Sequence, residues 1–68
     1  MFTSILAAAA SCELPVGFMY HDKARVGYVQ EVSQNPTRPT FLLESQDPEE
    51  FGQLKRFYID ETKSLILL

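Results

Sequence analysis

The chain has 68 residues, which bounds it to a single domain covering residues 1–68. Hydrophobic residues make up 46% of it, enough for a folded core and too much for a disordered segment. Six basic residues against nine acidic ones give a net charge of −3, which argues against strong nonspecific binding to nucleic acid. The single cysteine excludes an internal disulfide, and no apolar run approaches the roughly 20 residues that span a bilayer. We therefore expect a cytoplasmic protein with no membrane contact.

Residues 3–12 are predicted to form a short helix. The run Ala7–Ala10 has high helix propensity, and Pro15 marks the end of the helical segment. Ile5, Ala8, Ala9 and Cys12 recur at helical spacing and predict one apolar stripe with a buried thiol. A helix of this length is unstable alone in water, so we expect it to cover one open end of a sheet.

Five short strands are predicted after the helix, over residues 16–20, 24–32, 40–45, 54–59 and 64–68. The first two are joined by a polar turn and should form a hairpin. In the fourth strand, alternation places Phe57 and Ile59 on the inner face. Gly17 in the first strand indicates a bend or a close approach of another backbone, and Gly27 lies in the middle of the second strand, where small barrels commonly bend.

The segment Asp47–Glu50 carries a helix-start signal. Asp47 suits an N-cap, Pro48 suits the first helical position, and Gly52 suits a left-handed stop. The sequence therefore predicts a single helical turn here rather than a functional acidic site.

The predicted fold class is mainly β, with a short N-terminal α-helix followed by a five-stranded barrel of SH3-like or Sm-like order. Closing the barrel would remove the sheet edges that invite aggregation.

Three short pieces of the chain carry a family resemblance. The first is a strand ending in Tyr20 and followed closely by Arg25, the second is Thr40-Phe41-Leu42, and the third is Arg56-Phe57-Tyr58-Ile59-Asp60 followed by Ser64-Leu65. With these pieces, residues 14–68 resemble the WYL domain, an Sm-like barrel usually found behind a DNA-binding domain in bacterial regulators. The resemblance implies that basic and aromatic positions hold a nucleotide or nucleic-acid ligand.

The sequence also departs from the WYL pattern. Thr40 stands in place of the tryptophan, Tyr58 and Glu61 stand where the family tends to have arginines, and Thr62 stands where it has an apolar residue. The chain contains no helix-turn-helix pattern of its own, so it does not read as a complete regulator.

One group of basic and aromatic residues forms the candidate binding surface, because arginine forks recognise phosphate or carboxylate and aromatic rings stack on bases. We predict a ligand-binding site made of Tyr20, Arg25, Arg38, Arg56 and Tyr58, with Lys55 and Phe41 as weaker candidates. The alternative is that the aromatic residues are core and the arginines pair with the nine acids. That alternative is preferred for Phe41.

No catalytic, metal or cofactor site is predicted. His21 has no Cys, Asp or Glu at ligand spacing, and Cys12 has no base placed to activate it. The adjacent pairs Glu49-Glu50 and Asp60-Glu61 lie in turns, where neighbouring carboxylates point apart.

The sequence therefore predicts a non-enzymatic binding or regulatory module, WYL-like, that recognises a protein partner or, less strongly, a nucleotide or nucleic acid. The apolar segment 64–68 also suggests self-association into a homo-oligomer, because shared burial helps so short a chain. An alternative is a small acidic protein of phage or plasmid type that blocks a basic site on a host protein, or a structural protein. Four of the nine acids lie between Glu44 and Glu50, which favours that alternative.

Overall fold

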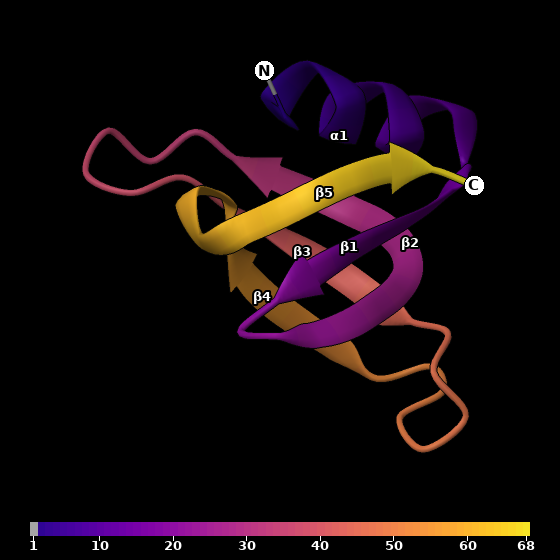
Figure 1. Ribbon diagram of the computed structural model, residues 1–68. Helices are drawn as coiled ribbons and strands as arrows, with labels where there is room; N and C mark the ends of the chain where they lie inside the picture. Colours follow the sequence, from indigo (N-terminus) through magenta and orange to yellow (C-terminus); the bar gives the residue numbers. More distant parts are fainter. Residues whose placement is uncertain (1) are drawn as a thin grey trace.

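A computed structural model describes residues 2–68, in which one helix precedes an antiparallel sheet of five strands (Figure 1). The helix α1 spans Phe2–Cys12, and a short 3₁₀ turn, η1 (Ile59–Glu61), precedes the last strand. The strands are β1 (Pro15–Tyr20), β2 (Lys23–Ser33), β3 (Thr40–Ser45), β4 (Leu54–Tyr58) and β5 (Thr62–Leu67). The predicted mainly β fold, with one helix and five strands, is therefore confirmed.

The helix α1 ends through its backbone. Glu13 adopts a left-handed conformation with φ of 55°, and the N–H of Leu14 donates to the carbonyl of Ala9 at 3.1 Å. This is the bonding of a Schellman C-cap, which satisfies a carbonyl that the helix leaves free. The chain then enters β1 at Pro15, where the missing N–H prevents the helix from continuing.

The face that α1 buries differs from the predicted stripe. Leu6 and Ala9 are fully buried, and Ile5 and Ala10 pack beside them against the core. Cys12 is exposed, so the prediction of a buried thiol is wrong. The helix is rotated on the sheet so that Leu6, rather than Cys12, completes the apolar stripe.

A tight turn joins β1 to β2. His21 and Asp22 have φ values of 49° and 62°, and Tyr20 and Lys23 pair directly on either side of them. Two central residues with positive φ are what a type I′ hairpin turn requires, because this turn matches the right-handed twist of its strands. Histidine and aspartate are among the residues that tolerate this conformation best.

The strand order of the sheet is β4-β3-β2-β1-β5. Figure 1 shows the long strand β2 curving, so that its first half pairs with β1 and its second half with β3. The sheet is not a closed barrel as predicted, because β4 and β5 are its two edges and do not pair with each other within residues 2–68. The turn η1 connects β4 to β5. Side chains form hydrogen bonds with backbone groups at the edge of β4 that a neighbouring strand would otherwise bind.

Those side chains come from β1 and β5 and meet at Tyr58, the last residue of β4. The next residue, Ile59, donates its N–H to the carbonyl of Pro39 on the β3 side, so the N–H and carbonyl of Tyr58 point to the free edge. The Tyr20 hydroxyl accepts the N–H, and the Thr62 hydroxyl donates to the carbonyl at 3.0 Å. Tyr20 and Thr62 are themselves paired across β1 and β5.

The core lies between the curved sheet and α1. Three phenylalanines form its centre, with ring centroids of Phe18 at 5.4 Å from Phe41 and at 5.3 Å from Phe57. Phe57 on β4 is buried and Ile59 packs against the core, so the predicted inward orientation of both side chains is confirmed, although Ile59 begins η1 and does not belong to the strand. Gly27 lets β3 approach β2 closely: a Cβ atom on Gly27 would lie 2.8 Å from Cγ of Leu43 and would clash with the carbonyl of Glu44.

The segment between β3 and β4 forms hydrogen-bonded turns in place of the predicted helical turn. The N–H of Glu50 donates to the carbonyl of Asp47, and the N–H of Gln53 donates to that of Glu50. Ser45, rather than Asp47, provides the side-chain oxygen: its hydroxyl accepts the N–H of Asp47 at 3.2 Å. The left-handed stop at Gly52 is confirmed by a φ of 82°.

Candidate functional site

Arg38 and Tyr58, two residues of the predicted binding surface, lie in direct contact. The guanidinium carbon of Arg38 lies 3.6 Å from the centre of the Tyr58 ring, which is cation–π geometry. Its Nε lies 3.0 Å from Oδ2 of Asp60, and its Nη2 pairs with Glu61. The hydrogen bond to Asp60 is the chief cause that raises the pKa of Arg38. Nε and Nη2 of Arg38 are therefore engaged within the chain.

Tyr20 belongs to the same group of side chains. Its ring stacks on His21 at a centroid separation of 4.3 Å, and its hydroxyl accepts the N–H of Tyr58. His21 in turn pairs with Glu61, and this hydrogen bond is the chief cause that lowers the pKa of the Glu61 carboxyl. Contacts with His21 and Tyr58 therefore join the tip of the β1–β2 hairpin to the end of β4 and to η1.

Arg25 lies on the inner face of β2, where it pairs with the buried Phe18 of β1. Its Nη1 lies 2.9 Å from Oε2 of Glu50, and its guanidinium carbon lies 5.5 Å from the centre of the Phe57 ring. Lys55 shares the same carboxylate at 3.1 Å. The hydrogen bond from Lys55 is the chief cause that lowers the pKa of Glu50. The Nε atom of Arg25 is buried without a hydrogen-bond partner in the described part of the chain.

Arg56 lies on the outward face of β4 and is exposed. Its Nη1 donates to the Thr40 hydroxyl at 3.1 Å, and its Nη2 lies 3.8 Å from Oε1 of Glu31. Thr40 lies on the neighbouring strand β3. Glu31 lies one strand farther, on β2, because Arg56 pairs with Leu42 and Leu42 pairs with Glu31. This is the least constrained of the three predicted arginines.

The structure thus brings Tyr20, Arg38 and Tyr58 into contact. Arg56 lies on the same outward face of β4 as Tyr58 and bonds Thr40, the strand partner of Tyr58, whereas Arg25 lies on the inner face of β2 and pairs with Glu50. Each of the three predicted arginines forms an ion pair with an acidic side chain of the same molecule. Phe41 is fully buried in the core. The five-residue ligand site stays a prediction.

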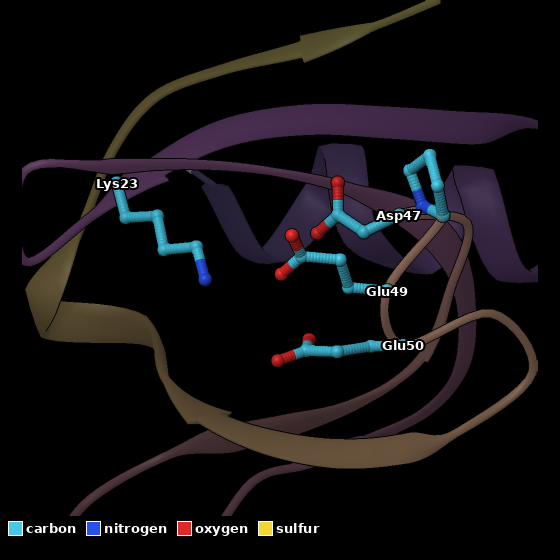
Figure 2. Close-up of a pocket in the computed structure, with 5 residues that line it drawn as sticks. Lys23, Asp47, Glu49 and Glu50 are labelled. Atoms are coloured by element: carbon cyan, nitrogen blue, oxygen red, sulfur yellow. The ribbon is translucent and has the colours of Figure 1, made fainter.

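A separate cleft of about 310 Å³ lies between the start of β2 and the turn that follows β3. Lys23, Asp47, Pro48, Glu49 and Glu50 line it. Figure 2 shows the carboxylates of Asp47, Glu49 and Glu50 directed into the same space as the Lys23 ammonium group. Glu50 is held by Arg25 and Lys55, whereas Asp47 and Glu49 make no ion pair within residues 2–68.

The charges that stay unpaired are mainly acidic. Four of the six basic side chains, Arg25, Arg38, Lys55 and Arg56, pair with acids. In the described part of the chain, the side chains outside every ion pair are Glu13, Asp22, Glu44, Asp47, Glu49, Lys23 and Lys63. The surface available to an external ligand therefore carries five carboxylates and two ammonium groups.

Within residues 2–68, no group of three or more His, Cys, Asp or Glu side chains is arranged to hold a metal ion. Over the same residues, no helix has the length and apolar character needed to cross a bilayer. The chain matches no protein-family model, no curated protein and no solved structure in comparisons with known proteins.

The sequence pattern predicts a helical turn over Asp47–Glu50 and does not indicate a binding cleft. The local pattern alone could not reveal the cleft, because its opposite wall is Lys23 on a strand far away in the sequence. The only available signal was the density of acids between Glu44 and Glu50, which supported the alternative of an acidic protein-binding surface.

Proposed function

We propose that this chain is a non-enzymatic binding module, SH3-like or Sm-like in its strand order and related in type to the WYL domain, that recognises a basic segment of a protein partner. The distribution of unpaired charge supports this proposal most directly. A ligand that carries phosphates would need free cations, and four of the six basic side chains are already engaged by acids. A partner that presents lysine or arginine would instead meet an excess of free carboxylates.

The cleft between β2 and the segment 46–53 is the place on the surface best suited to such a side chain. Asp47 and Glu49 point into it from one wall, and Lys23 enters from the other without forming an ion pair. Lys23 therefore occupies space that an external cation would take, and the two would compete for the same carboxylates. Electrostatic complementarity of this kind mainly raises the association rate and gives selectivity.

The SH3-like or Sm-like description draws on the strand order β4-β3-β2-β1-β5, with a 3₁₀ turn between the two edge strands. A WYL-type ligand site would have to use Tyr20, Arg38 and Tyr58, which already lie together. Binding a nucleotide there would set its phosphates beside the carboxylates of Asp60 and Glu61, which hold Nε and Nη2 of Arg38.

The experiment compares two probes by titration calorimetry at low salt: a peptide rich in lysine and arginine, and a single-stranded RNA. We expect the peptide to bind and the RNA to show no heat of binding. The double variant Asp47→Asn, Glu49→Gln should weaken peptide binding, and Lys23→Ala should strengthen it. Glu13→Gln serves as the control, because it removes one unpaired carboxylate outside the cleft. Binding of RNA without binding of peptide would contradict the proposal.

The second candidate, a small acidic inhibitor, rests on the same free carboxylates and differs only in its effect on the partner. Once a partner protein is captured, its activity with and without the chain separates the two functions. A loss of activity that Asp47→Asn and Glu49→Gln relieve would favour the inhibitor.

A further inference from the structure

An apolar surface covers the outward side of β5, β1 and the first half of β2. It is made by Met19, Ala24, Gly17, Val26, Ile66 and Leu68, which we call the outer face. Strand pairing places Ile66, Gly17 and Val26 side by side in one row. Leu68 covers Gly17, since a Cβ atom there would lie 3.4 Å from the Leu68 side chain. Met19, Ile66 and Leu68 keep 37%, 55% and 57% of their surface exposed.

Two charged residues mark opposite corners of the outer face. Lys63 pairs with Met19 near the start of β5. Glu44 lies on β3 beside the opposite end of the outer face, where it pairs with Tyr28 and shares an opening with Glu13. Lys63 and Glu44 are both free of ion pairs in the described part of the chain. The carboxylates of Asp60 and Glu61, which share an opening with Lys63, are engaged by Arg38. Asp22 also borders that opening, at the tip of the hairpin.

This arrangement is complementary to itself. In a twofold dimer the same surface patch is used by both subunits, and the axis lies in the plane of the interface. An axis that crosses the outer face perpendicular to the line from Lys63 to Glu44 exchanges these two corners. Lys63 of each copy then lies opposite Glu44 of the other. The row of Ile66, Gly17 and Val26 packs against the same row of the second copy.

We propose that the outer face is the interface of a homodimer in which Lys63 of each copy pairs with Glu44 of the other. This goes beyond the proposed recognition of a basic segment, because the outer face excludes the cleft of Asp47 and Glu49. Dimerisation would bury exposed apolar side chains in a chain whose own core is small. It would also leave the two clefts free on the assembled molecule.

Sedimentation equilibrium over a wide concentration range tests the proposal with charge-reversal variants. We expect a reversible dimer. Lys63→Glu and Glu44→Lys, each alone, should raise the dissociation constant by roughly tenfold, because each creates two like-charge pairs in place of two ion pairs. The double variant, in which the two charges are exchanged, should restore the affinity of the original chain.

Matched controls separate this interface from a general effect of net charge. Lys23→Glu and Glu49→Lys make the same changes of charge outside the outer face and should leave the dissociation constant unchanged. Ile66→Glu should abolish the dimer while the melting curve of the monomer persists, and Ile66→Ser serves the same purpose if the glutamate prevents folding. A chain that stays monomeric, a double variant that fails to restore the dimer, or a dimer indifferent to Ile66 substitution would each overturn the proposal. None of these outcomes depends on whether a basic peptide binds the cleft.

Discussion

The hydroxyl oxygen of Tyr20 lies 3.3 Å from the backbone nitrogen of Tyr58 and accepts its N–H at the free edge of β4. Tyr20→Phe removes this acceptor and keeps the ring that packs against Phe57. We expect unfolding in urea to show a loss of about 0.5–1 kcal/mol, toward the low end for a hydrogen bond because water can reach the exposed strand end. Tyr28→Phe is the control, since no hydrogen bond is made by the Tyr28 hydroxyl within residues 2–68. Equal losses in the two variants would mean that the edge bond contributes nothing.

Stability should fall with acid because two carboxyl groups have lowered pKa values. Lys55 is the main cause for Glu50 and His21 for Glu61, and the ordinary value for both is 4.5. A carboxyl whose pKa is depressed by folding stabilises the native state above its unfolded pKa. That contribution is lost as the pH falls through the folded value. We expect the urea midpoint to decline below pH 4.5, and Glu50→Gln to make that decline shallower.

Glu49→Gln is the matched control for this acid series, since Glu49 forms no ion pair in the part of the chain that the structure describes. Its urea midpoint should follow the original chain at every pH. A decline equally shallow in both variants would show that the ion pairs of Glu50 are not responsible.

Gly27→Ala should destabilise the fold by about 1–3 kcal/mol, as overpacking in a filled core does. The added methyl group would meet Cγ of Leu43 at 2.8 Å and the backbone of β3, which cannot move aside without breaking the β2–β3 pairing. Gly17→Ala adds the same methyl group where the nearest atom is 3.4 Å away, at the end of the flexible Leu68 side chain. Thermal melts of the two variants should therefore differ clearly. A Gly17 variant as unstable as the Gly27 variant would contradict this explanation.

Phe41→Ala should cost about 3–5 kcal/mol, the range for emptying a buried aromatic site. Phe41 is fully buried between Phe18 and Phe57, whereas Phe51 keeps 70% of its surface exposed. Phe51→Ala makes the same chemical change at the surface and should shift stability by no more than about 0.5 kcal/mol. Denaturant unfolding measures both. A small loss for Phe41→Ala would mean that the aromatic centre is not essential to the fold.

The strands could be predicted because their signals are local. Alternation in β1 and β4, the polar turn at His21 and Asp22, and Gly52 each depend on a few neighbouring residues. The rotation of α1 could not be predicted, because Leu6 and Cys12 are both apolar and only the shape of the sheet beneath decides which is buried.

The ion pairs also could not be predicted from local sequence patterns. The composition allows the arginines to pair with acids, but the acidic partners of Arg25 and Arg38 lie more than twenty positions away in the sequence. Whether the sheet closes depends in the same way on distant residues, because Tyr20 and Thr62 reach the end of β4 only after the strands have assembled.

The pairing of β1 with β5 has a consequence during protein synthesis. The strands β1, β2 and β3 are consecutive and can zip together soon after they leave the ribosome. Val16 pairs with Leu67, which is much farther away along the chain than the partners of β1 in β2 are. Until β5 has paired, one side of β1 stays open to the hydrogen-bonding groups of any neighbouring unfolded chain, so a delay in the β1–β5 pairing would favour aggregation.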